Sequence, residues 1–218
     1  LDSITSIGGE LIIWYNPLLT SLSGLENLTS IGEGLEITYN NSLISFEGLN
    51  YLTHIAGYLK INMNFLLSDV SGLDNLTYVG GNVEIENSAM TGLTGLESLT
   101  SIGGDLRIMG SSILNLSGLC NLASIGGSFE SAGNSALLNF SGLDHLNTIG
   151  GGILIYCNDG IIDFSGLNGL TSVDGILIEY NTSLTSLSGL DNIEASSITC
   201  LLIFDNYRLT TCEVHSVC

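Results

Sequence analysis

A near-constant spacing of aliphatic residues runs through the whole 218-residue chain and constrains its fold more than any other feature. Each interval holds one copy of a phrase such as Ser-Gly-Leu-Glu-Asn-Leu-Thr-Ser-Ile at 23–31, which returns in similar form at 71–79 and 141–149. The steps between the closing residues are 24, 24, 24, 23, 23, 24, 24 and 25. A period this regular predicts a solenoid, in which each unit buries its apolar residues against its neighbours. The closing residues are Ile7, Ile31, Ile55, Val79, Ile102, Ile125, Ile149, Val173 and Ile198.

Each repeat also contains a short alternating segment after a glycine turn. In the first repeat, the alternation predicts a strand whose Leu11 and Ile13 face the core while Ile12 faces solvent. Stacking one such strand per repeat predicts an all-β solenoid, a parallel β-helix of about nine rungs and on the order of 40 Å in length. The equivalent inward pairs are Leu35/Ile37, Leu59/Ile61, Val83/Ile85, Leu106/Ile108, Ile153/Ile155, Ile176/Ile178 and Leu201/Ile203.

The turns of each repeat carry their own polar pattern. An Asn after the strand is expected to form a hydrogen-bonded ladder, which only Met109-Gly110-Ser111 interrupts. A second short strand is expected next, followed by a capping box such as Ser23 with Glu26 that opens one helical turn. We interpret the acids of these boxes, such as Glu26, as capping residues and not as calcium ligands, because calcium needs about 6–8 converging oxygens. The predicted ladder residues are Asn16, Asn40, Asn64, Asn87, Asn134, Asn158, Asn181 and Asn206, and the predicted strand ends are Leu22, Phe46, Val70, Leu93, Leu116, Phe140, Phe164 and Leu187.

The charge balance limits the partners. The chain has 22 acidic residues against three basic ones, Lys60, Arg107 and Arg208, so its net charge is −19. Nucleic acid and anionic membrane surfaces are excluded as partners, because both need clustered Lys or Arg. No apolar run approaches the roughly 18 residues of a membrane span, so this segment is not expected to insert. We interpret residues 1–218 as one domain that starts inside a repeat and closes with a cap at about 199–218.

Three of the five cysteines fall in the last 19 residues, where the repeat pattern dissolves. A bridge between Cys212 and Cys218 would staple that end of the solenoid and would indicate an oxidising compartment. The alternative is that Cys200, Cys212 and Cys218 are three reduced thiols. Cys120 and Cys157 are expected to be unpaired.

The outward positions of the main sheet carry the functional information, because the core does not dictate them. The middle residue of each strand reads Ile, Glu, Lys, Glu, Arg, Glu, Leu, Leu, Leu from the first rung to the last. In-register stacking would place Lys60 between Glu36 and Glu84, and Arg107 between Glu84 and Glu130. We interpret these pairs as holding the register and not as a ligand site, since exposed pairs each contribute about 1 kcal/mol or less.

The last three rungs differ from the charged rungs. Leu154, Leu177 and Leu202, with Tyr156 and Phe204, are predicted to form an exposed apolar patch, which soluble monomers seldom leave uncovered. A protein or glycan ligand would explain the patch. The other explanation is a cover supplied by the C-terminal tail, by a segment outside this sequence or by a second copy in a homodimer.

The aromatic and Thr patterns suggest two further sites. Trp14, Tyr15 and Tyr39 lie near the N-terminal end, where their rings would stack on sugars or simply pack at a corner.

A Thr column formed by Thr29, Thr53, Thr77, Thr100 and Thr171 raises ice binding as a remote alternative, although Ala123 and Asn147 interrupt the column.

Catalysis is not expected. Right-handed β-helices include polysaccharide lyases and hydrolases, whose chemistry needs converging acids or a base beside a metal. Here His54, His145 and His215 fall on separate rungs, and the acids are distributed along the repeats. No cofactor and no metal site is predicted.

The repeat resembles the receptor L-domain family, a leucine-rich-repeat-like right-handed β-helix found in the extracellular ligand-binding lobes of the epidermal growth factor and insulin receptors and in bacterial secreted proteins. The sequence motifs that carry the resemblance are Leu-Leu-Thr-Ser-Leu-Ser-Gly-Leu at 18–25, Leu-Thr-Ser-Ile at 28–31 and the Gly-x-Leu-x-Ile-x-x-Asn strand. The resemblance implies a non-enzymatic module for recognition or adhesion, extracellular or on a cell surface. The Cys-x-x-x-x-x-Cys at 212–218 resembles the closing element of bacterial members. A structural spacer in a cell-surface protein is the main alternative function.

Overall fold

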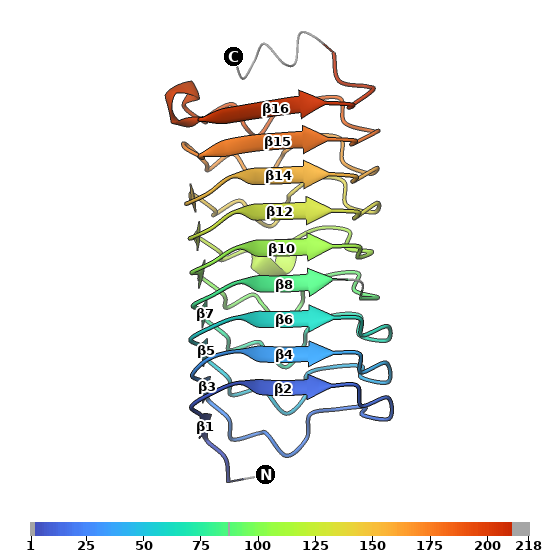
Figure 1. Ribbon diagram of the computed structural model, residues 1–218, viewed down its shortest axis with the longest axis vertical. Helices are drawn as coiled ribbons and strands as arrows, with labels where there is room; N and C mark the ends of the chain where they lie inside the picture. Colours follow the sequence, from blue (N-terminus) through green and yellow to red (C-terminus); the bar gives the residue numbers. More distant parts are fainter. Residues whose placement is uncertain (1–2, 87, 211–218) are drawn as a thin grey trace.

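The computed structural model describes residues 3–86 and 88–210 of the chain, which form a single elongated stack of rungs (Figure 1). One face is a nine-stranded parallel sheet with one strand per rung. A narrower sheet of seven two-residue strands runs along one side. The predicted parallel β-solenoid is therefore confirmed. The large sheet comprises β2 (Leu11–Trp14), β4 (Leu35–Thr38), β6 (Leu59–Asn62), β8 (Val83–Glu86), β10 (Leu106–Met109), β12 (Phe129–Ala132), β14 (Ile153–Tyr156), β15 (Gly175–Glu179) and β16 (Cys200–Phe204).

The narrow sheet is built from the residues that close each repeat. Its members pair in register, so that Ile31 lies beside Ile55 and Ile55 beside Val79. On seven rungs the second strand therefore lies at the closing aliphatic residue, and the expected strands ending at Leu22 and its equivalents are wrong. Those residues are buried, but in the described part of the chain they have no strand conformation. The narrow sheet comprises β1 (Ser6–Ile7), β3 (Ser30–Ile31), β5 (His54–Ile55), β7 (Tyr78–Val79), β9 (Ser101–Ile102), β11 (Ser124–Ile125) and β13 (Thr148–Ile149).

The core is a continuous column of aliphatic side chains between these faces. Residues from Leu22 to Ile193 form one buried cluster, in which each predicted inward pair of the interior rungs contacts its equivalents above and below. Phe140 packs edge-on against Phe129 at 5.4 Å between ring centroids and lies 5.5 Å from Phe164. Burying each large aliphatic or aromatic side chain stabilises the stack by about 1.5–3 kcal/mol.

An Asn ladder occupies the corner after the large sheet, as predicted. The Oδ1 of Asn158 accepts a hydrogen bond from the backbone N–H of Asn134 at 3.0 Å, one rung below. Its Nδ2 donates to the carbonyl oxygens of Ser131 at 2.8 Å and Tyr156 at 3.1 Å. Each buried amide thus satisfies backbone groups on two rungs, which would otherwise be buried without partners.

Two serines occupy the ladder position on the fourth and fifth rungs, and each hydroxyl donates to a carbonyl of its own rung, that of Glu86 or Met109, at 3.3 Å. Asn87, the predicted fourth member, lies outside the described residues, and the buried residue one period after Asn64 is Ser88. At the fifth rung, Ser111 donates from its backbone N–H to Oδ1 of Asn134 at 3.0 Å. The series of buried amides is therefore interrupted at this rung, as predicted, while the backbone of Ser111 still donates to the amide of the next rung.

The expected capping boxes do not open helical turns. The N–H of Gly72 donates to the carboxylate of Asp74 at 2.9 Å, which closes a tight turn within the Ser-Gly-Leu-Asp phrase. The φ of Gly72 is +111°, and an added Cβ would lie 2.3 Å from the carbonyl oxygen of Phe46. A left-handed glycine at this point prevents a helix from starting. Short 3₁₀ turns occur within the described residues only at Ser117–Leu119 and Ala195–Ser197.

The Thr column has a structural role. The hydroxyl of Thr53 donates to the carbonyl of Thr29 at 3.1 Å, and the hydroxyl of Thr77 donates to the carbonyl of Thr53 at 3.0 Å. The hydroxyl protons of Thr29, Thr53, Thr77 and Thr100 are therefore engaged with the rung below. Separately, the described residues include no helix long and apolar enough to cross a membrane.

Replacing Asn158 by Ala should destabilise the stack strongly. The change leaves the N–H of Asn134 and two carbonyl oxygens buried without their side-chain partner, which costs at least about 2 kcal/mol. Asn158→Ser should cost roughly half as much, because serine holds this position at Ser88 and Ser111. Urea unfolding followed by circular dichroism measures both. Equal losses for Ala and Ser would contradict the role given to the ladder.

Candidate functional site

The outer face of the large sheet presents three columns of side chains, one residue from each column per rung. In-register pairing of all nine strands places like positions directly beside one another. The first column is Glu10, Gly34, Tyr58, Asn82, Asp105, Ser128, Gly152, Gly175 and Cys200. The middle column is Ile12, Glu36, Lys60, Glu84, Arg107, Glu130, Leu154, Leu177 and Leu202. The third column is Trp14, Thr38, Asn62, Glu86, Met109, Ala132, Tyr156, Glu179 and Phe204.

Arg107 is the centre of an ion-pair network on the middle rungs. It lies between Glu84 and Glu130, as the stacking predicted. Its guanidinium donates to Glu84 at 3.0 Å, to Glu130 at 3.1 Å and to Asp105 at 2.8 Å. These carboxylates raise the pKa of Arg107 above its ordinary value, against the opposing effect of burial. Lys60 lies in register between Glu36 and Glu84, but its ion pair with Glu36 is longer, at 3.7 Å.

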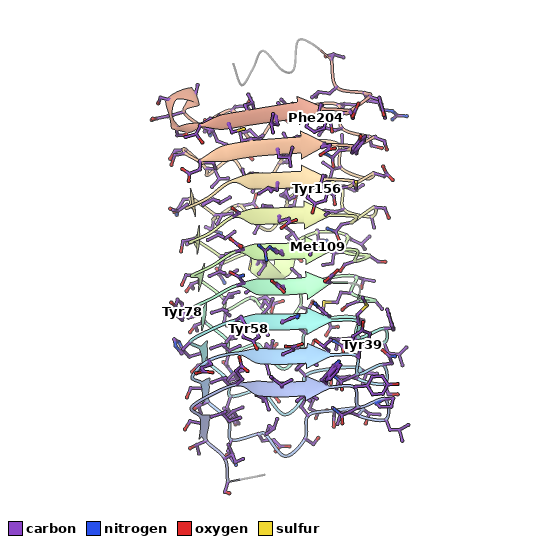
Figure 2. The ribbon with its side chains drawn as sticks, in the orientation of Figure 1. Tyr39, Tyr58, Tyr78, Met109, Tyr156 and Phe204 are labelled. Atoms are coloured by element: carbon purple, nitrogen blue, oxygen red, sulfur yellow. The ribbon has the colours of Figure 1, made fainter. Side chains whose placement is uncertain are left out.

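Tyr156 ends this polar network. Its hydroxyl donates to Oε1 of Glu130 at 2.5 Å, and this bond, with partial burial, raises the pKa of Tyr156 to about 12. The side chain, which is labelled in Figure 2, is half-buried. Tyr156 was predicted to belong to the apolar patch, and it instead forms the border between the charged rungs and that patch.

A chain of side-chain acceptors runs up the first column and stops at Gly152. Oδ1 of Asn82 accepts the N–H of Asp105, and Oδ1 of Asp105 accepts the N–H of Ser128. Oγ of Ser128 then accepts the N–H of Gly152 at 3.1 Å. Gly152 and Gly175 add no side chain to the face, so the chain of polar groups ends at the seventh rung.

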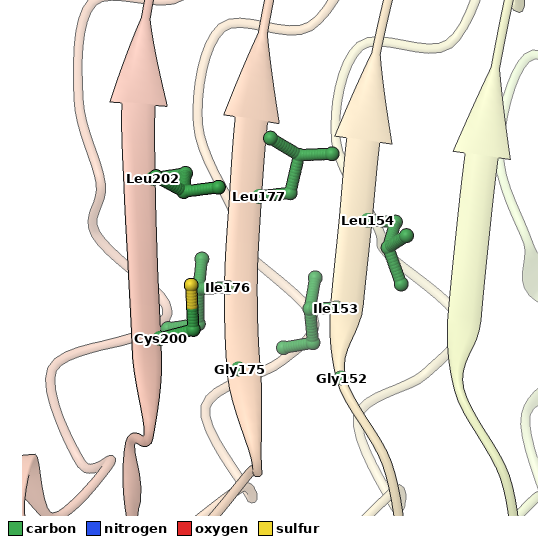
Figure 3. Close-up of a pocket in the computed structure, with 8 residues that line it drawn as sticks. All are labelled: Gly152, Ile153, Leu154, Gly175, Ile176, Leu177, Cys200 and Leu202. Carbon is green, nitrogen blue, oxygen red and sulfur yellow. The ribbon is translucent and has the colours of Figure 1, made fainter.

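An apolar hollow begins where this polar chain ends. Leu154, Leu177 and Leu202 project from three adjacent strands, as Figure 3 shows, and the two glycines leave the space beside them open. The hollow has a volume of about 170 Å³, and the Cys200 side chain lies at its edge. Leu202 is 48% exposed, while Leu154 and Leu177 are partly buried. We call this site the leucine hollow.

The leucine hollow is not continuous with an apolar third column. Glu179 lies in register between Tyr156 and Phe204, so a carboxylate separates the two aromatic residues that were predicted to extend the patch. Sequence reasoning overlooked Glu179 and Cys200 because it followed the middle column. The period-2 alternation that defines the strands would have identified both, since each lies two residues from a middle-column leucine.

A second hollow, of about 310 Å³, lies lower on the same face and was also missed. Tyr58, Asn82 and Lys60 line it together with two carboxylates, those of Glu36 and Glu84. The Tyr58 ring packs over Gly34, where an added Cβ would lie 2.4 Å from the ring. Burial, together with the hydrogen bond to Glu10, raises the pKa of Tyr58 to about 12.

The predicted aromatic cluster at the N-terminal end is spread over two rungs. Trp14 is 64% exposed, Tyr15 71% and Tyr39 40%. Tyr15 and Tyr39 have left-handed φ angles of 57° and 58°, because they turn the chain into the corner before the Asn ladder. Tyr15 lines a hollow with Pro17 and Leu18. Within the described residues, no ring contact joins Trp14, Tyr15 and Tyr39 into one platform.

The described residues hold no group of three or more His, Cys, Asp or Glu that would bind a metal ion. Among them, Cys120, Cys157 and Cys200 are free thiols. The bridge predicted between Cys212 and Cys218 lies outside the described residues, and it stays a prediction.

Comparison with known proteins agrees with the fold. The family model of the receptor L domain matches residues 29–93, which span β3 to β8 and the turns around them. The resemblance inferred from the repeat is therefore confirmed over this part of the chain. The receptor L domain is a non-catalytic ligand-binding family and is typically extracellular. Searches of curated proteins and of solved structures each gave no match.

Replacing Arg107 by Gln should destabilise the protein by about 1 kcal/mol at low ionic strength, because three carboxylates lose their shared cation. Added salt should recover much of the loss by screening the remaining repulsion. Lys60→Gln is the matched control and should cost less, since Lys60 makes one long ion pair. Urea midpoints at low and high salt measure the effect, and a salt-independent loss would contradict it.

Removing the Tyr156 hydroxyl should change stability at high pH. The folded pKa of Tyr156, about 12, lies above the ordinary value of 10.0, so the neutral phenol stabilises the fold below pH 10. That contribution is lost as the pH rises from 10 to about 12. Tyr156→Phe should therefore lose less stability over this range than the wild type in urea unfolding. Tyr58 has a similarly raised pKa and is present in both proteins as a common background.

Proposed function

We propose that this protein is an extracellular recognition module that binds a macromolecular ligand through the outer face of its large sheet. The leucine hollow is the observation that carries the proposal. It is an apolar depression next to five rungs whose middle residues are charged, and the core does not require leucine at these outward positions. Exposed apolar patches of this kind on soluble proteins mark interaction sites. The match to a ligand-binding family over residues 29–93 supports the same conclusion.

The energetics favour a ligand over a purely structural explanation. The leucine side chains contribute to rung stacking through their contacts with one another, but polar pairs would serve that purpose, as they do on the charged rungs. Covering apolar surface contributes roughly 25 cal/mol per Å². An apolar ligand group that binds in the leucine hollow would therefore contribute favourably to the free energy of binding, and the site is already formed before the ligand binds.

A glycan ligand at the N-terminal end is the second candidate. The exposed rings of Trp14 and Tyr15 favour it, since exposed aromatic faces stack on sugars. The main alternative function is a spacer that separates other parts of a cell-surface protein, in which case neither surface has a ligand.

The substitution Leu177→Glu should abolish ligand binding at the leucine hollow. It places a charge where an apolar group must be covered, which is unfavourable unless the charge is paired. The wild type and the variant would be tested on a glycan array and a peptide array, with light scattering to measure their mass. Leu138→Glu is the matched control, because Leu138 is exposed but lies outside the three columns of the sheet face.

Binding that is lost in Leu177→Glu and kept in Leu138→Glu would support recognition through this face. A dimer that becomes a monomer only in Leu177→Glu would assign the face to self-association. Monomers with identical array profiles in all three proteins would favour the spacer.

A further inference from the structure

We infer that the leucine hollow takes an apolar side chain of a protein segment that also presents a Lys or Arg side chain to Glu179. This inference rests on the proposed function and names the chemistry of its partner. Two observations carry it. Among the described residues, the Glu179 carboxylate has no partner, although other acids on this face are paired, and the adjoining hollow is lined by apolar residues and Cys200.

The acids of the outer face show the contrast. Glu36 pairs with Lys60, and Arg107 pairs with three carboxylates on neighbouring rungs. Glu10 accepts the hydroxyl of Tyr58. The carboxylate of Glu179, in the part of the chain that the structure describes, makes no hydrogen bond and no ion pair. An unpaired, half-buried carboxylate in a protein of net charge −19 is a site for an external cation.

The neighbours of Glu179 do not neutralise it. In register, Tyr156 lies on one side and Phe204 on the other. The Tyr156 hydroxyl is engaged with Glu130 on the far side of its own strand, and Phe204 has no donor. Arg107 is three rungs away along the stack, roughly 14 Å at the usual strand spacing, and its donors are held by three other acids.

Glu179 adjoins the leucine hollow without lining it, because it lies on the side of Leu177 away from Gly175. Glu179 follows Leu177 by two residues on β15, so both side chains lie on the outer face of one strand, about 7 Å apart along it. This distance suits two side chains of one extended segment. An aliphatic group would enter the hollow while a neighbouring Lys or Arg reaches the carboxylate.

The chemistry of the hollow favours a protein partner over a glycan. Its lining consists of leucines, isoleucines, glycines and Cys200. Sugar hydroxyls placed against this lining would lose water without gaining hydrogen bonds, which is unfavourable. The volume of about 170 Å³ is below the roughly 300–1,000 Å³ typical of small-molecule pockets, and it suits a single side chain.

A peptide array tests the partner directly. The probes are 12-residue peptides that contain one Leu followed one or two positions later by Lys, and the same peptides with that Lys replaced by Gln or Glu. Affinities of the best binders are measured by fluorescence anisotropy for the wild type, Glu179→Gln, Glu179→Lys and Leu177→Glu. Glu47→Gln is the matched control, because it removes an exposed acid outside the outer face and makes the same change in net charge.

The expected result is that Lys peptides bind the wild type more tightly than Gln or Glu peptides. Glu179→Gln should weaken Lys-peptide binding about fivefold and leave the Gln peptides unchanged, while Glu47→Gln has little effect. Glu179→Lys should reverse the preference, so that the Glu peptides bind best. Such a reversal cannot arise from misfolding.

Other outcomes separate this inference from the proposed function. Suppose that peptide binding is lost in Leu177→Glu, but that the Lys, Gln and Glu peptides bind the wild type equally well. This outcome would overturn the role of Glu179 and would still support recognition through the hollow. Binding to a glycan array that is lost in Leu177→Glu, with no peptide bound, would overturn the protein partner. Absence of any binding that depends on Leu177 would overturn both.

Discussion

The rest of the structure depends on in-register stacking of equivalent residues. Backbone hydrogen bonds join each rung to the next, and the Asn ladder fixes the register at the corner, where the amide of Asn158 binds backbone groups on two rungs. A shift of one residue would turn every inward leucine outward. The period of 23–25 residues is therefore a geometric requirement, and each outward position becomes a column of like positions.

This stacking determines what the outer face can carry. A column made only of acids would repel itself, so the charged rungs need cations between acids, and Lys60 and Arg107 occupy these places. The first column is likewise held by side chains that accept the N–H of the next rung, up to Gly152. The leucine hollow lies where both the ion pairs of the middle column and the side-chain acceptors of the first column end. Its position therefore follows from the loss of polar ladders on the last three rungs as much as from the leucines themselves.

The sequence allowed prediction of those features that depend only on the period. The inward pairs, the nine-stranded sheet and the place of Arg107 between Glu84 and Glu130 follow once the rungs are aligned. The strands expected at Leu22 and its equivalents were wrong because buried leucines in a turn have the same spacing as leucines in a strand. The helical turn expected at Ser71 and Asp74 was wrong because its signature ignores the left-handed glycine between them. The position of Glu179 on the outer face follows from the alternation of β15, but its lack of a partner depends on the side-chain contacts of neighbouring rungs and needed the structure.

The unpaired carboxylate of Glu179 also argues against a spacer as the explanation for this face. A solenoid selected only for length and solubility gains nothing from leaving one carboxylate half-buried beside an apolar hollow. Replacing Glu179 by a neutral residue would remove a local charge at no cost in packing, and replacing Leu177 by a polar residue would reduce exposed apolar surface. Both features oppose solubility or stability slightly, and they occur side by side on one strand. Their proximity is explained if an apolar group and a cation from one ligand occupy them together.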